Sequence, residues 1–181
     1  SADEAKIKSG SPFDVVSLDA ERNRLSNLFR NNGYYYYQPS YASYRADTVN
    51  TPGKVKLDVE LADNLPEKAL KKWYIGNISI NLRRTFMEEL KDSIHYYFFH
   101  AYFNGKKPPV RPRVIMSDMK LRHGQPYDYS KHTESNNRIA SKGMFSSVDF
   151  QFTPRDTTAA CDTLDLLLNC VFDKPYDFYV E

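Results

Sequence analysis

An internal repeat constrains this chain more than any other feature of its sequence. The peptide Gly-Ser-Pro-Phe-Asp at positions 10–14 returns as Gly-Gln-Pro-Tyr-Asp at positions 124–128. Each copy precedes a polar, helix-like run that ends at a glycine, Gly33 or Gly143, and an aromatic-rich segment then leads to an Asp-Thr step. These landmarks keep their order at a spacing of about 110 residues, as duplicated modules do when their loop lengths vary. The repeat predicts a tandem array of one small module, which favours a scaffold or binding role.

Hydrophobic patterning in the first copy predicts one helix followed by two strands. Apolar residues from Leu18 to Phe29 share one helical face, with Ser17 as the expected N-cap. Gly33 follows the helix and is expected at positive φ, as helix-terminating glycines are. A strand is expected over residues 41–46. Strict alternation of apolar and charged residues over 54–61 predicts a second strand with one buried face.

The second copy contains the same pattern with an additional opening. Residues 73–82 are expected to form a strand, and helices are expected over 113–121 and 130–142. Strands are expected over 148–152 and 163–172. This order is β-α-α-β-β, and the fold class is α+β. The apolar depth of 163–172 predicts that this strand is central, with both neighbouring strands at the edges of the sheet.

The two copies imply two domains. We expect a first module at 1–65, which lacks its opening strand, and a complete second module at 66–181. We expect the first module to be part of a longer protein, with residues 3–8 corresponding to the end of its first helix. Residues 83–111 have no counterpart in the first copy. Their aromatic run at 95–103 is either a strand that extends the sheet or an exposed edge that meets a partner.

Composition limits the possible partners. The 181 residues include 25 Lys and Arg against 23 Asp and Glu, for a net charge of +2, which is too balanced to indicate nucleic-acid binding by charge alone. No apolar run approaches the roughly 20 residues of a membrane helix. Cys161 and Cys170 are too far apart along one extended strand to form a disulfide with each other.

No catalytic or metal-binding motif stands out, so the chain is not expected to be an enzyme and no cofactor or metal is expected. His95 and His100 are five residues apart, a spacing that suits neither one helical face nor one strand face. Asp47 and Asp156 occupy the same position in the repeat. We interpret both as turn-capping residues, because the residues that form the turns of a module recur in each copy, whereas an active site usually does not.

Several short motifs, taken in order, resemble POTRA (polypeptide-transport-associated) domains of the BamA/TamA family of outer-membrane assembly proteins. The motifs cover nearly the whole chain. In the first copy they are Phe-Asp at 13–14, Leu-Asp-Ala-Glu-Arg at 18–22, Asn-Gly-Tyr-Tyr at 32–35 and Ala-Asp-Thr at 46–48. In the second copy they are Tyr-Ile-Gly at 74–76, Arg-His-Gly-Gln-Pro-Tyr at 122–127 and Gly-Met-Phe-Ser-Ser-Val at 143–148. The peptides at 174–176 and 179–181 resemble the exit from a last POTRA domain into a first barrel strand.

This resemblance implies a three-stranded mixed sheet in each module, with two helices on one face. It also implies a periplasmic location at the outer membrane and a C-terminal β-barrel in the parent protein. The partners would be unfolded outer-membrane proteins or translocated polypeptides, and accessory envelope subunits. Open sheet edges would receive an extended client as an added strand. The expected client-binding edge residues are Tyr41, Ser43, Tyr44, Val148, Asp149, Phe150, Gln151 and Phe152.

Two questions stay open at the level of sequence. A small α+β sheet that carries aromatic residues is also typical of single-stranded nucleic-acid binders. Interleaved basic and acidic residues argue against that alternative, and no nucleic-acid partner is expected. If the N–H of Gln151 faces outward, Gln151→Pro should weaken client capture more than it weakens folding.

Overall fold

The computed structural model describes residues 5–12, 14–47 and 53–173. The chain divides into two compact units, Ser1–Lys72 and Trp73–Glu181, and the expected α+β class is confirmed. Some expectations fall wholly or partly outside the described residues: the helix end at 3–8, the motifs at 13–14 and 46–48, and the exit peptides at 174–176 and 179–181.

The first unit consists of a long helix, a short two-stranded sheet and two short helical turns. Its elements are α1 (Val15–Arg30), η2 (Pro39–Tyr41), β1 (Ala42–Asp47), β2 (Lys56–Leu61) and α2 (Glu67–Leu70). Asp14 caps α1, because its carboxylate accepts the backbone N–H groups of Val16 and Ser17 at 3.1 and 3.2 Å. The expectation that Ser17 is the cap is wrong: Ser17 lies inside the first turn and donates its hydroxyl to Asp14.

Gly33 ends α1 as expected. Its φ is +100°, and the N–H of Tyr34 reaches back to the carbonyl of Phe29 at 3.2 Å. The aromatic segment that follows then folds onto the helix. The ring of Phe29 stacks on Tyr37 at 4.3 Å between centroids and meets Tyr34 edge-on at 5.5 Å. The repeated glycine-aromatic motif therefore returns the chain to the face of its own helix.

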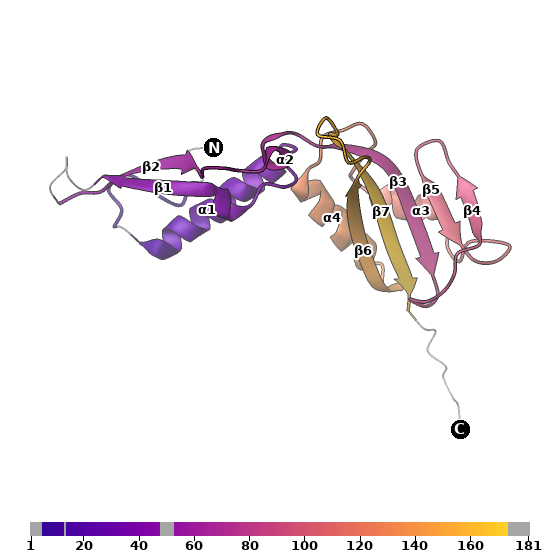
Figure 1. Ribbon diagram of the computed structural model, residues 1–181. Helices are drawn as coiled ribbons and strands as arrows, with labels where there is room; N and C mark the ends of the chain where they lie inside the picture. The colour runs from indigo at the N-terminus through magenta and orange to yellow at the C-terminus, as the bar shows by residue number, and fades with distance from the viewer. Residues whose placement is uncertain (1–4, 13, 48–52, 174–181) are drawn as a thin grey trace, which may run out of the picture. The chain divides into compact units, whose positions relative to one another are not determined.

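The second unit contains a five-stranded sheet in the order β4-β5-β3-β7-β6. Its elements are β3 (Tyr74–Arg83), β4 (Asp92–His95), β5 (His100–Phe103), α3 (Pro112–Asp118), α4 (Tyr129–Ala140), β6 (Phe145–Pro154) and β7 (Thr163–Phe172). Both helices lie behind the sheet in Figure 1. Within the described part of the chain, every helix is too short or too polar to span a lipid bilayer.

The sheet has five strands because residues 83–111 contribute two of them, so the expected three-stranded sheet is wrong for this unit. β4 and β5 form an antiparallel hairpin, and β5 pairs with β3 in parallel. The strand expected within the aromatic run is present as β5, and it extends the sheet. β7 is interior, between β3 and β6, as expected. Of these two neighbours only β6 is an edge strand, since β5 pairs with the other side of β3 and β4 forms the second edge of the sheet. The sheet is mixed, with β7 parallel to β3 and antiparallel to β6.

The core of this unit lies between the sheet and its helices. Alternate residues of β7 from Leu164 to Cys170 are buried, and the apolar residues of β3 meet them. A register shift between Ile75 and Ile78 changes the face presented by β3. As a result Ile75 is buried and Tyr74 is only half-buried, the reverse of what uninterrupted alternation predicts.

The second copy of the repeat peptide has two structural roles. Gly124 donates its N–H to the carbonyl of Ile75 at 2.7 Å, and Ile75 donates to the carbonyl of Gln125 at 2.8 Å. The peptide therefore pairs with the start of β3. It ends at Asp128, which caps α4 by accepting the N–H of Lys131 at 3.1 Å, as Asp14 does for α1.

Replacing Gly33 with alanine should destabilise the first unit by about 1 kcal/mol or more. An L-residue is strained at φ +100°, and a Cβ atom there would lie 3.3 Å from Cβ and Cγ of Lys72. The unfolding free energy can be measured by urea denaturation followed through tyrosine near-ultraviolet circular dichroism. An unchanged midpoint and slope in Gly33→Ala would contradict this assignment.

Candidate functional site

All the expected client-binding residues except Tyr41 fall on two edge strands, one in each unit. Val148 to Phe152 all lie within β6, which forms one edge of the five-stranded sheet. Ser43 and Tyr44 lie on β1 of the two-stranded sheet. Tyr41 belongs to the short helix η2 and not to a strand. The two edges differ in what their backbone groups contact.

The register of β6 shows which backbone groups point to the open edge. Arg155 lies opposite Thr163, and its N–H donates to the carbonyl of Thr163 at 2.9 Å. The pairing runs without a shift from Ser147 to Pro154. Hydrogen-bonded and non-hydrogen-bonded pairs alternate along antiparallel strands. It follows that the N–H and C=O groups of Val148 and Phe150 point away from β7, toward the edge.

The same alternation turns the backbone of Gln151 inward. Gln151 lies opposite Leu167, four positions from the bonded pair at Arg155, so its N–H faces β7. The effect expected for Gln151→Pro required the N–H of Gln151 to face outward. That condition is not met, so the expectation for this substitution is wrong. Pro154, by contrast, takes the place of an edge-facing N–H, which is where an edge strand tolerates proline.

The outer edge of β1 is partly covered by α1. Tyr41 lies opposite Ala62, and the N–H of Ala62 donates to its carbonyl at 2.9 Å, which turns the carbonyl of the next residue, Ala42, outward. The Nε atom of Arg22 donates to that carbonyl at 3.1 Å, and the hydroxyl of Tyr44 donates to the carbonyl of Leu18 at 3.1 Å. These contacts occupy the position that an added strand would need.

Aromatic side chains line the helix-facing side of β6. The ring of His132 on α4 lies 4.9 Å from Phe150 and 5.0 Å from Phe152, and Tyr127 meets Phe152 edge-on at 5.4 Å. Phe150 and Phe152 are half-buried, while Asp149 and Gln151 on the other face are exposed. A strand added at this edge would find apolar surface on the helix side and polar surface on the other.

The residues expected to have structural roles lie at turns and strand ends. Gly143 follows α4 at φ +69°. The carboxylate of Asp156 accepts the backbone N–H of Thr158 at 2.9 Å, the contact that a turn-capping aspartate makes. Asp47 ends β1 opposite Lys56. Cys161 and Cys170 are both buried and are not joined in a disulfide, and burial raises the pKa of Cys170 to about 12.

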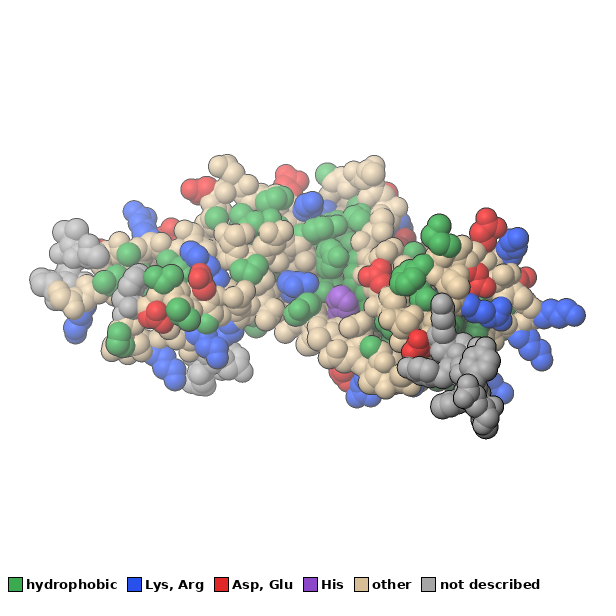
Figure 2. Space-filling view, turned by 90° about the horizontal axis from the view of Figure 1, so that it is seen from below, with side chains coloured by type: hydrophobic (Ala, Val, Ile, Leu, Met, Phe, Trp, Pro, Cys, Tyr) green, Lys and Arg blue, Asp and Glu red, His purple; other side chains and the backbone are tan. Residues whose placement is uncertain are grey.

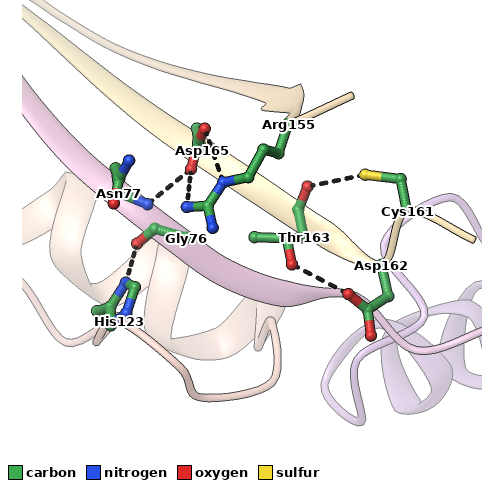
Figure 3. Close-up of polar contacts among 8 residues, drawn as sticks. All are labelled: Gly76, Asn77, His123, Arg155, Cys161, Asp162, Thr163 and Asp165. Carbon is green, nitrogen blue, oxygen red and sulfur yellow. Dashed lines mark hydrogen bonds and ion pairs between the residues drawn. The ribbon is translucent and has the colours of Figure 1, made fainter. Parts of the chain in front are cut away.

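A polar cluster fixes the irregular start of β3 to β7 (Figure 3). Asp165 accepts the N–H of Asn77 at 2.7 Å and the Nη2 of Arg155 at 2.7 Å. His123 contacts the carbonyl of Gly76 through Nδ1 at 2.7 Å. A Cβ at Gly76 would come within 2.6 Å of Nη2 of Arg155, so a larger residue there would have to displace this ion pair. Partial burial raises the pKa of Asp165, but the hydrogen bonds from Arg155 and Asn77 outweigh it, and the net shift is downward.

His95 and His100 are brought together, contrary to the expectation from their spacing. They lie directly opposite each other on β4 and β5, with ring centroids 4.6 Å apart. A spacing of five suits neither one helix nor one strand, but a two-residue hairpin turn places residues i and i+5 across from each other. The turn residues, Tyr97 and Phe98, are not typical of tight turns, so the sequence carried no signal for this register.

Comparison with solved structures identifies proteins of similar fold. Over 92% of its length the chain is similar to the crystal structure of BamA from Haemophilus ducreyi lacking POTRA domains 1–3, with a TM-score of 0.61 and 11% identity. The chain has a BamA-like fold. It spans about a quarter of that structure's length, 25%. The resemblance stated from the sequence motifs is thus confirmed at the level of fold.

Two cyanobacterial structures give weaker likenesses. They are POTRA1–3 of the periplasmic domain of Omp85 from Anabaena, at 16% identity, and the N-terminal domain of Omp85 from Thermosynechococcus elongatus, at 17%. They cover 92% and 90% of this chain and 54% and 55% of theirs, but TM-scores of 0.44 and 0.45 are too low to support an argument. No protein-family model matches the sequence, and no curated protein matches it.

Replacing Asp165 with asparagine should lower the unfolding free energy of the second unit by about 1–2 kcal/mol at neutral pH, since it removes charged hydrogen bonds. The pKa of Asp165 is lowered in the fold from 3.8, so its contribution is fully present above about pH 4 and disappears as the pH falls further. Urea denaturation followed by fluorescence of the single tryptophan, Trp73, at pH 7 and pH 3 measures this difference.

Asp162→Asn is the matched control, because Asp162 is exposed and accepts only the hydroxyl of Thr163 among the contacts drawn in Figure 3. It should change the unfolding free energy little at either pH. Equal destabilisation by Asp165→Asn at pH 7 and pH 3 would contradict the role given to the carboxylate.

Proposed function

We propose that this chain is a polypeptide-binding scaffold in the periplasmic part of an outer-membrane protein assembly or translocation factor. It binds extended segments of unfolded clients by β-augmentation at β6. One observation carries the proposal: β6 is a ten-residue edge strand whose Val148 and Phe150 backbone groups point outward, in a chain with a BamA-like fold. The clients are unfolded outer-membrane proteins or translocated polypeptides, and accessory envelope subunits are further partners.

The edge of β6 would bind an extended client and would also accept clients of many different sequences. Main-chain hydrogen bonds to an added strand depend little on the sequence of the client. Alternate side chains of that strand would lie beside Phe150 and Phe152, over α4, so a client with apolar residues at every second position fits best. The sequences of outer-membrane barrel strands have this alternation.

We further propose that the chain comprises two copies of one module, at 1–65 and 66–181. In both units an aspartate caps a helix that ends before a positive-φ glycine, and an antiparallel strand pair follows. The proposed boundary after residue 65 lies inside the first compact unit, which extends to Lys72. The residues between the two boundaries form the short helix α2 and the connection to β3.

The distribution of charge favours a polypeptide over a nucleic-acid partner. On the face shown in Figure 2, basic and acidic side chains are interspersed and form no continuous basic stripe. Several basic residues are engaged in ion pairs, among them Arg138 with Glu134 at 2.8 Å and Lys142 with Asp118 at 2.7 Å. A phosphate backbone would need such cations unpaired along one track.

Val148→Pro should weaken binding of a β-prone peptide with the alternating pattern of a barrel strand by about tenfold, since it removes one edge-facing N–H. It leaves the hydrogen bonds between β6 and β7 in place, so the variant should stay folded. Fluorescence anisotropy of the labelled peptide gives the dissociation constant, and a thermal melt reports folding.

The matched control is Gln151→Pro, which removes an N–H that faces β7. It should lower the unfolding free energy by about 1 kcal/mol or more while the outward groups of the edge stay intact. A folded Val148→Pro variant that binds the peptide as tightly as the wild type would eliminate this edge as the docking site.

A further inference from the structure

The hairpin of β4 and β5 places two imidazole rings side by side. The N–H of Tyr96 donates to the carbonyl of Phe99 at 2.9 Å and closes a turn with two central residues. Hydrogen-bonded and non-hydrogen-bonded pairs alternate outward from this bond, so His95 and His100 form a non-hydrogen-bonded pair. Side chains approach each other most closely in such pairs.

The nitrogen atoms of this histidine pair converge. Nδ1 of His95 and Nδ1 of His100 are in direct contact. On the far side of the His95 ring, Nε2 lies 3.3 Å from the hydroxyl oxygen of Ser93. In the tautomer of His95 that carries its proton on Nε2, the Ser93 hydroxyl accepts from Nε2–H and Nδ1 keeps a lone pair. The Nδ1 atom of His95 faces the second imidazole.

We propose that the pair of His95 and His100 binds one divalent transition-metal ion of the Zn²⁺, Ni²⁺ and Cu²⁺ class through the two Nδ1 atoms. Neutral imidazole is a preferred ligand of these ions, whereas Mg²⁺ and Ca²⁺ prefer oxygen. His95 is exposed and His100 half-buried, so water completes the coordination shell and the ion exchanges with solvent. Among the described residues, no third His, Cys, Asp or Glu joins the pair.

A bound ion would link the two strands of a weakly attached hairpin. β4 is held by four residue pairs with β5, and β5 by three pairs with β3. The tip of this hairpin carries the exposed aromatic residues Tyr97 and Phe98, at 93% and 68% exposure. Metal binding therefore stabilises the far edge of the sheet, opposite β6, and fixes the strands that present this aromatic tip.

Isothermal titration of the full chain with Zn²⁺ alone tests the proposal. One ion per chain should bind, Mg²⁺ should not compete, and His95→Asn and His100→Asn should each weaken binding at least tenfold. Binding of Cu²⁺ should be tighter than binding of Ni²⁺, and it should broaden backbone amide resonances of residues 93–102 first, because Cu²⁺ is paramagnetic.

His123→Asn is the control, since His123 lies in the cluster at Gly76 and not in the hairpin. It should bind Zn²⁺ like the wild type. His95 is exposed and His100 is half-buried, so circular dichroism of each variant is needed to check that it is folded. Absence of Zn²⁺ binding, or binding that survives in folded His95→Asn and His100→Asn, overturns the proposal.

Discussion

Pairing of β7 with a strand on each side is the interaction on which the second unit depends. Alternate side chains of β7 are fully buried against β3 and the helices, and its backbone joins a parallel strand to an antiparallel one. Because β7 pairs with a strand on each side, β6 has only one paired side and is left as a ten-residue edge strand with a fixed register. The geometry of the edge is therefore set by the core and not by the edge residues themselves.

The two units treat their edges differently. In the first unit, Arg22 of α1 donates to the carbonyl of Ala42, so the helix occupies part of the edge of β1. In the second unit, the apolar residues of β6 pack toward α4, and within residues 5–12, 14–47 and 53–173 no side chain is bonded to the outward backbone groups of Val148 and Phe150. Pro154 limits the edge at its far end by removing one donor. These contacts make β6 the better template for an added strand.

Local sequence patterns predicted the elements well and their partners less well. Strict alternation located β2 and β7, and the glycine stops located the ends of α1 and α4, because both signals are properties of the local chain. The buried face expected for β2 is wrong: Val59 and Leu61 are exposed, since no described element covers that side of the two-stranded sheet. The cap at Asp14 was missed, since a serine three residues later fits the same rule. The bulge in β3 could not be read from the sequence, because the close approach at Gly76 comes from Arg155 and Asp165, about 80 to 90 residues further along the chain.

The sequence predicted which strand forms the candidate site, but not which of its backbone N–H groups point outward. The sequence located the edge residues of β6, yet which of them present their N–H outward depends on the pairing of β6 with β7, a contact between separate strands. The pairing of His95 with His100 depends in the same way on a turn made by Tyr97 and Phe98. Register is a property of strand pairs, and single-segment periodicity does not contain it.

Amide hydrogen exchange, measured by nuclear magnetic resonance with and without a bound barrel-strand peptide, tests the edge assignment most directly. In the free protein, Asp149 and Gln151 should already be protected, while Val148 and Phe150 exchange rapidly. With peptide bound, exchange at Val148 and Phe150 should slow markedly and that at Asp149 and Gln151 should change little. Peptide binding that leaves Val148 and Phe150 unprotected, or that protects another strand instead, would contradict the account.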